Sequence, residues 1–179
     1  MTDAFTASVP RLETQRLTMR EYRREDFDAF ANHFADTKST IHLALVDREA
    51  AWRIFSSHAG LWLLQGSGWW AIEVRQTGEV VGNIGGFFRE SSPVMEVGAN
   101  IYRRFWRHGF VFEAVAAVLD YAFGVRGEPM VQVLTSRQEK AMLRIAQSQG
   151  WIHDGDREVY GRLVDVYTKS RESWTAISG

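Results

Sequence analysis

The chain has 179 residues, a length that fits one domain and leaves little room for two. Apolar residues make up 45% of it, including seven Trp and eleven Phe, so a core can form without disulfide or metal staples. Because the chain has no Cys, thiolate nucleophiles and Cys-ligated zinc are excluded. The net charge is −1 and the basic residues are scattered, which argues against a nucleic-acid or membrane-surface partner.

The N-terminal segment does not look like a secretory signal. Residues 1–10 contain no basic region followed by an apolar run. Elsewhere, no apolar run reaches the length of about 18 residues that a membrane-spanning helix requires. We therefore expect a cytoplasmic protein in which residues 1–10 form a flexible N-terminus.

The N-terminal third of the chain predicts a strand and then two helices. Side chains alternate in character from Leu17 to Tyr22, which is typical of a strand. Aromatic and small residues recur at helical spacing from Phe27 to Phe34. A second helix is expected to begin after the N-cap Asp47 and to end at Gly66. The aromatic residues of both helices are interpreted as core rather than as a ligand site.

Three strands are predicted in the middle of the chain. Residues 69–75 and 80–88 are rich in aromatic and β-branched residues, and the short turn between them contains Gly, so they predict a hairpin. A further strand is expected from Val94 to Tyr102, with Glu96, Gly98 and Asn100 on one of its faces. Gly98 indicates either a bulge or a close approach of the backbone.

The C-terminal half predicts alternating helices and strands. A helix from Gly109 to Phe123 is expected at the centre of the domain, because Glu113 and Asp120 are its only charged residues. After it come a strand at 130–134, a helix at 138–149 and two strands, at 151–156 and 159–168. This order predicts an α+β (mixed α/β) fold, in which a mixed sheet carries helices on both faces.

The junction between the Glu96 strand and the buried helix is a candidate anion site. A loop with Gly109 at the mouth of a helix presents unpaired backbone N–H groups and the positive end of the helix dipole. Arg103, Arg104 and Arg107 add charge that can pair with phosphate oxygens. An ordinary solvated turn would have a similar sequence, so the local pattern leaves both interpretations open.

Several short motifs occur in a characteristic order along the chain. They are Leu12 to Leu17, Arg23 to Asp26, Trp70 to Ile72, Thr77 to Glu79, Gly82, Met95 to Gly98, Trp106 to Ala114, Leu119 to Phe123, and Arg144 to Trp151. In order and spacing they resemble the GCN5-related N-acetyltransferase (GNAT) superfamily, and within it the branch that includes the ribosomal-protein N-terminal acetyltransferases. The resemblance implies one domain over residues 11–174 and a C-terminal tail at 175–179. It also implies a twisted, mostly antiparallel sheet of about six to seven strands.

The resemblance further implies a donor site for acetyl-CoA, in a cleft where the Glu96 strand and the Met130 strand splay apart. Backbone groups near Ile101 would pair with the pantetheine arm, and the N–H groups of residues 107–111 would hold the pyrophosphate. The implied donor contacts are Asn100, Ile101, Tyr102, Arg104, Arg107, His108, Gly109, Phe110, Val111 and Phe112.

The chain departs from the family pattern at expected donor contacts. Val111 stands where Gly or Ala is usual, and Phe112 stands where a small Thr or Ser is usual. Glu139 and Met142 occupy the positions of the family's Asn and Ser near the start of the penultimate helix. These departures motivate an alternative, in which a GNAT-fold protein acts as a non-catalytic ligand-binding or interaction module.

Glu96 is the residue that the resemblance implies as general base. Amine acetylation requires a proton to leave the ammonium before it attacks the thioester, and a carboxylate in a partly dry cleft can take it. The alternative is a structural Glu96, paired with Arg89 or Arg103. Tyr102 is a candidate acid for the leaving thiolate. The expected reaction is direct acetyl transfer to a primary amine, carried by a small molecule or a protein N-terminus.

The sequence predicts no metal site and no defined partner protein. The five His residues show no metal-ligand spacing with a carboxylate; they are His33, His42, His58, His108 and His153. The high Trp content permits a homodimer without requiring one. The acceptor pocket is expected between the first two helices and the loop at 156–160, segments whose sequences do not identify the acceptor.

Overall fold

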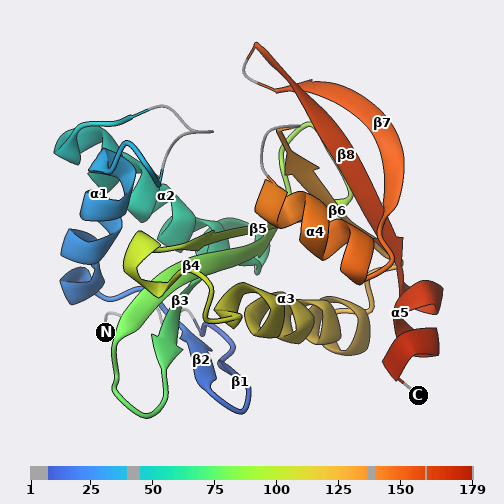
Figure 1. Ribbon diagram of the computed structural model, residues 1–179, viewed down its shortest axis with the longest axis horizontal. Helices are drawn as coiled ribbons and strands as arrows, with labels where there is room; N and C mark the ends of the chain where they lie inside the picture. Colours follow the sequence, from blue (N-terminus) through green and yellow to red (C-terminus); the bar gives the residue numbers. More distant parts are fainter. Residues whose placement is uncertain (1–7, 40–44, 137–139, 160, 179) are drawn as a thin grey trace, which may run out of the picture.

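The structure is a computed structural model that describes residues 8–39, 45–136, 140–159 and 161–178. In these ranges the chain forms one mixed sheet with helices packed on it (Figure 1). In chain order the elements are β1 (Leu12–Glu13), β2 (Leu17–Arg20), η1 (Arg24–Asp26), α1 (Phe27–Ala35), α2 (Arg48–Gln65), β3 (Gly68–Val74), β4 (Val80–Phe87), β5 (Met95–Ile101), η2 (Arg103–Phe105), α3 (Phe110–Asp120), η3 (Tyr121–Val125), β6 (Met130–Thr135), α4 (Lys140–Ser148), β7 (Ile152–Val159), β8 (Arg162–Ser170) and α5 (Arg171–Ser178).

The sheet has eight strands in the order β1-β2-β3-β4-β5-β6-β8-β7. All neighbouring strands are antiparallel except β5 and β6, which are parallel. The predicted α+β fold, a mostly antiparallel sheet with helices on both faces, is therefore confirmed. The sequence analysis missed the two-residue strand β1, and it missed α5, which includes part of the expected tail. Both are too short, or too close to the chain end, to carry a clear periodic pattern.

Helix α2 begins and ends where the sequence predicts, for the expected physical reasons. The Asp47 side chain accepts a hydrogen bond from the Ala50 N–H at 2.7 Å, which caps the N-terminus. Gly66 ends the helix in the left-handed region, at φ 63°. Helical spacing predicts Ala59 and Leu63 on the buried face of this helix, but both are exposed, Leu63 by 55%. The buried stripe of α2 is narrow, since it consists of Ala51, Phe55 and Trp62, and Leu63 lies beside it.

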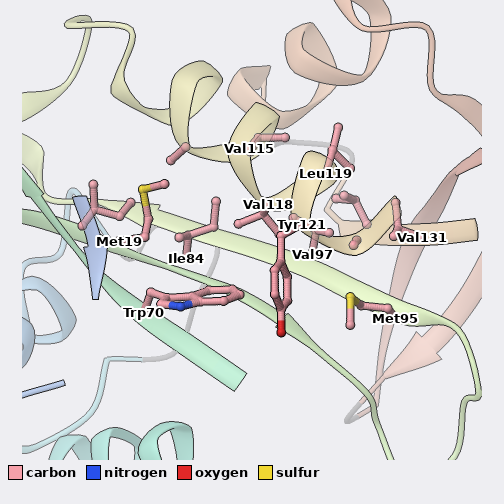
Figure 2. Close-up of a cluster of buried hydrophobic side chains, with 14 of the residues drawn as sticks. Met19, Trp70, Ile84, Met95, Val97, Val115, Val118, Leu119, Tyr121 and Val131 are labelled. Atoms are coloured by element: carbon pink, nitrogen blue, oxygen red, sulfur yellow. The ribbon is translucent and has the colours of Figure 1, made fainter. Parts of the chain in front are cut away.

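The main core lies between the sheet and α3 (Figure 2). Trp70, Ile84 and Val97 come from neighbouring strands, and Val115, Val118 and Leu119 come from α3. Trp70 is fully buried, and its ring meets Tyr121 edge to face at 5.5 Å. This packing confirms the prediction that the helix after Gly109 is buried at the centre of the domain.

The opposite face of the sheet is covered by α1 and α2. Their aromatic residues form a second core cluster, made of Phe27, Phe30, Ala31, Phe34, Ala51 and Phe55. Because side chains alternate along a strand, Trp70 faces α3 while its neighbour Trp69 faces α2. Trp69 stacks there on His58, with ring centroids 4.2 Å apart and planes 4° from parallel. Each face of the sheet at β3 to β5 therefore has its own helical layer.

Candidate active site

The sheet opens between β5 and β6. These strands pair only at Met95 with Val131 and at Glu96 with Gln132. Beyond that point β5 continues along β4 to Ile101, and β6 continues along β8 to Thr135. In the described part of the chain, the facing edges of the two strands have no strand partner after Glu96, so their backbone groups are available to a ligand.

The loop that follows β5 leads into α3 through an unusual backbone. Gly109 precedes the helix with a φ of 75°. Arg107 has a φ of 66°, and no other non-glycine residue in the described ranges has a positive φ. Such a conformation costs an L-residue roughly 1–2 kcal/mol, and strain of this kind is concentrated at functional sites. No described side chain caps α3 at this position, so its first N–H groups remain available.

Two carbonyl groups of this loop are turned towards side chains. The Trp106 carbonyl lies 3.0 Å from His108 Nδ1, and the His108 carbonyl accepts a hydrogen bond from Arg16 Nη1 at 2.9 Å. In a trans peptide, the C=O of one residue and the N–H of the next point in opposite directions. The N–H groups of Arg107 and Gly109 therefore point away from these partners. Together with the start of α3 they form an anion-binding arrangement.

The three arginines of the loop have different environments. Arg103 is paired with Asp36, with 2.5 Å between Nε and Oδ2, and Arg104 is paired with Glu79. Arg107 is exposed and has no ion-pair partner within the described residues. Of the charges that the sequence placed at this loop, that of Arg107 is therefore the most available to a phosphate.

The bulky residues that depart from the family pattern lie on different sides of α3. Val111 is partly buried and packs against the main core, whereas Phe112 is 42% exposed. The neighbouring Phe110 is buried, 9% exposed. Glu139 lies outside the described residues, and so does the side chain of Met142. On the β5 side, the Ile101 carbonyl accepts a hydrogen bond from the Trp106 indole at 2.7 Å, which leaves it one lone pair for a ligand.

Glu96 lies at the last point where β5 pairs with β6, with its side chain on the α1/α2 face. It is 6% exposed and makes a bidentate ion pair with Arg89, at 2.5 and 2.8 Å. Of the two pairings that the sequence left open, the structure contains the one with Arg89, since Arg103 binds Asp36. Glu96 is thus held in one orientation beside the opening, and its charge is balanced locally.

Tyr102 lies further along the same face, in a buried polar cluster. Its ring is 5.2 Å from that of His33 on α1, and Asn83 and Asn100 of the adjacent strands are joined by a hydrogen bond of 2.8 Å. Burial raises the pKa of Tyr102 above its ordinary value, so the phenol keeps its proton at neutral pH. Burial lowers the pKa of His33 to about 4, and the nearby charge of Asp36 offsets only part of this effect.

The sequence analysis did not find this cluster. Both ring nitrogens of His33, and Asn83 Nδ2, are buried without a hydrogen-bond partner among the described residues. A neutral polar group in such a position is a candidate contact for a ligand or a bound water. The sequence carries only a weak indication of the cluster, because His33 is one polar residue in an aromatic helix and Asn83 stands in a Gly-rich strand.

A group of potential metal ligands forms where β7 meets β8. His153 Nε2 lies 3.8 Å from Asp156 and 3.6 Å from Asp165, and the ligand atoms of all three lie within 4.8 Å of one another. A bulge between His153 and Asp156 brings the group together. Sequence spacing could not reveal it, since Asp165 comes from the next strand. Among the residues that the structure describes, these three could hold a cation.

A shallow groove of about 410 Å³ lies away from the opening, between α2 and the segment after β2. Tyr22, Arg24, Trp52, Phe55 and Leu63 contribute to its walls. The Arg24 guanidinium stacks over Trp52, with 4.7 Å between its central carbon and the ring centroid. None of the residues that line the groove belongs to β5, β6 or the loop before α3, so the groove is separate from the opening.

Among the described residues, no helix is both long and apolar enough to cross a bilayer.

A family model described as "Acetyltransferase (GNAT) domain" matches residues 16–152. The chain belongs to the GNAT acetyltransferase family. GNAT acetyltransferases take the acyl group from acetyl-CoA and acetylate amines. The loop of this GNAT chain fits the pyrophosphate of such a donor, because it offers outward N–H groups, an uncapped helix and the charge of Arg107.

This GNAT chain is similar to known proteins in sequence and to solved structures in fold. The uncharacterized N-acetyltransferase YoaA of Bacillus subtilis (strain 168) is 27% identical over 150 residues, which are 82% of this chain and 85% of that protein. An acetyltransferase structure from Agrobacterium tumefaciens str. C58 has a TM-score of 0.81 at 27% identity, over 94% of this chain and 99% of that chain. The ribosomal-protein-S5-alanine acetyltransferase from Vibrio fischeri has a TM-score of 0.70 over 93% and 99% of the chains. At 14% identity, this last likeness concerns the fold alone.

Proposed function

We propose that this GNAT chain transfers an acetyl group from acetyl-CoA to a primary amine, which attacks directly while both substrates are bound. The observation that carries the proposal is the uncapped start of α3 beside the opening between β5 and β6. The motif order of the chain is similar to that of the ribosomal-protein branch, so a protein N-terminus is the first acceptor to test. Small-molecule amines are the second.

In this proposal, the donor site is built mainly from backbone groups. The N–H groups of residues 107–111 bind the pyrophosphate, and the exposed edge of β5 near Asn100 to Tyr102 pairs with the pantetheine arm. Acetyl-CoA supplies the thioester. The side chains of Arg104, Arg107 and His108 surround the loop, although Arg104 would first have to leave Glu79.

Glu96 is proposed as the general base. It lies at the start of the opening, on the α1/α2 face, whereas residues 107–111, which we call the donor loop, lead into α3 on the other face. The acceptor can therefore reach the thioester from the face opposite the donor. The ammonium gives one proton to Glu96, the nitrogen bonds to the thioester carbon, and the carbon–sulfur bond then breaks. The nitrogen gives its second proton to solvent as the amide forms. Arg89 keeps the carboxylate oriented towards its side of the opening.

Tyr102 is proposed to donate its proton to the departing thiolate and to regain one from solvent. The phenol is protonated at neutral pH, as an acid requires, and burial raises its pKa, which makes loss of the proton more costly. The buried position, at 8% exposure, means that the thiolate would have to come close to the end of β5. That end is also where the pantetheine arm is proposed to lie.

The first experiment tests donor binding by thermal denaturation with acetyl-CoA. A ligand that binds only the folded state stabilises it, by about 2.7 kcal/mol at 100 times its Kd. We expect a concentration-dependent rise in Tm. If millimolar acetyl-CoA leaves the Tm unchanged, the transferase proposal fails and the non-catalytic alternative is favoured.

The second experiment tests Glu96 with an amine and peptide panel, measured by thiol release. Loss of a general base lowers the rate typically by about 10² to 10⁴. We expect Glu96→Gln to lose turnover by at least the lower value while still binding acetyl-CoA. The exposed Glu25→Gln is the matched control and should retain wild-type turnover. Turnover of Glu96→Gln equal to wild type would remove Glu96 from the mechanism.

A further inference from the structure

The turn between β1 and β2 reaches across to the donor loop. Arg16 stands in this turn, and its Nη1 donates a hydrogen bond to the His108 carbonyl at 2.9 Å. The same guanidinium lies over the ring of Phe110, with 4.9 Å between its central carbon and the ring centroid. Residues separated by more than ninety positions are thus joined at the proposed pyrophosphate site.

Arg16 is itself held in place by Glu113 from the first turns of α3. Its Nε donates to Glu113 Oε2 at 2.6 Å, and its backbone N–H donates to Oε1 at 2.8 Å. The Thr14 hydroxyl donates to Oε1 at 2.5 Å. Burial would raise the pKa of Glu113, but these hydrogen bonds and the charge of Arg16 lower it below its ordinary value. The carboxylate is therefore ionised at neutral pH and fixes the guanidinium in one orientation.

This arrangement decides which way the peptide between His108 and Gly109 faces. Because the peptide is planar and trans, a carbonyl bound to Arg16 turns the Gly109 N–H to the opposite side. Gly109 is at φ 75° and has no side chain, so without that bond the peptide plane has little to hold it. Loss of the bond would let the N–H turn away from an incoming anion.

We propose that Arg16 is a positioning residue for the donor, which orients the Gly109 N–H towards the pyrophosphate by holding the His108 carbonyl. The inference rests on the proposed function, since it assumes that acyl-CoA binds at this loop. Arg16 acts here through the geometry of its planar guanidinium, which bonds two acceptors at once. Glu113 supports it, and neither residue needs to contact the donor.

The test measures Kd by calorimetry for three probes: coenzyme A, 3′-dephospho-coenzyme A and pantetheine. The first two contain the pyrophosphate and the third does not. For Arg16→Ala and Arg16→Lys we expect about tenfold weaker binding of both coenzymes, the effect of one well-oriented hydrogen bond, and unchanged binding of pantetheine. Glu113→Gln, which keeps Arg16 but loosens its support, should show a smaller loss in the same pattern.

Arg16→Lys separates geometry from charge, because Lys keeps the positive charge but cannot make both bonds in the same plane. The control is Arg75→Ala, which removes another exposed arginine that bonds the Thr14 carbonyl on the same turn. We expect wild-type Kd values for all three probes in this control. If Arg16→Ala does not fold, Arg16→Lys and Glu113→Gln carry the same comparison.

Three results would overturn the inference. Equal binding of coenzyme A by wild type and the Arg16 variants would show that the loop does not need this bond. An equal loss for pantetheine would show a general structural effect. A loss for coenzyme A that is absent for 3′-dephospho-coenzyme A would show that Arg16 contacts the 3′-phosphate directly. By contrast, a wild-type protein that binds neither coenzyme would refute the proposed function itself, and the inference with it.

Discussion

His33 combines deep burial with a neutral imidazole. It is 6% exposed, and neither ring nitrogen has a hydrogen-bond partner among the described residues. Burial disfavours the charged form, so its pKa falls from 6.5 to about 4. In the unfolded chain the same imidazole titrates near its ordinary pKa, and the difference links protonation to folding.

The resulting pH dependence has a definite sign. Because the folded pKa is the lower one, the unfolded state binds more protons between about pH 4 and 6.5, and stability falls as the pH decreases through this range. We expect about 1 kcal/mol less stability at about pH 5.5 than at neutral pH from His33 alone. Urea unfolding at the two pH values measures it. His33→Gln should reduce the difference, and an unaltered difference in His33→Gln would contradict this account.

At the scale of elements, the close packing of β3, β4 and β5 beneath α2 depends on two glycines. Gly85 and Gly98 are paired across β4 and β5, and the Trp69 ring lies flat against both. A Cβ on Gly98 would come within 2.9 Å of Trp69, and one on Gly85 within 2.6 Å. The register at Gly98 is regular, so of the two predicted roles the structure contains a close approach, by a side chain, and no bulge.

Gly98→Ala should therefore destabilise the protein through overpacking. The added methyl group would have to displace the Trp69 ring, which lies between Gly98 and the ring of His58. Such overpacking typically costs about 1–3 kcal/mol. Chemical denaturation gives the free energy of unfolding. In a Trp69→Leu background, where the ring is absent, we expect the additional cost of Gly98→Ala to be much smaller. A cost that is the same in both backgrounds would place its origin elsewhere.

At the scale of the whole molecule, both ends of the chain hold α3. The turn after β1 binds Glu113 near the start of the helix through Thr14 and Arg16. Near the other end, Asp120 accepts a hydrogen bond from the Trp174 indole of α5 at 2.9 Å. The two charged residues of an otherwise apolar helix are thus its attachment points. The sequence identified Glu113 and Asp120 as the only charged residues of this helix but could not supply their partners.

Removal of the C-terminal attachment should lower global stability without altering the donor loop. Trp174 also packs against the main core, and its ring centroid lies 6.5 Å from that of Phe123. We expect Trp174→Ala to cost about 2 kcal/mol, less than a fully buried Trp, and Trp174→Phe to cost about 1 kcal/mol through the lost hydrogen bond. Urea unfolding measures both losses, and calorimetry with coenzyme A should give a wild-type Kd. A large change in Kd would show that the two ends of α3 are coupled.

The sequence alone determined the fold class and the two core layers, and it predicted the place of the donor loop. Periodicity reports which face of an element is buried, and the caps at Asp47 and Gly66 are local chemistry, so both can be read along the chain. The resemblance of ordered motifs added the family. The position of Glu96 followed from the same pattern, but its catalytic role stays a prediction.

Tertiary structure decided which side chains meet. The Glu96 pair with Arg89, the polar cluster of His33, the group around His153 and the hold of Arg16 on His108 all depend on contacts between different elements. Local sequence carries no record of such contacts, because they arise from strand register and from the direction in which distant turns approach. The proposed pyrophosphate loop could therefore be predicted from its own residues, whereas Arg16, which bonds its His108 carbonyl, lies more than ninety residues earlier in the chain.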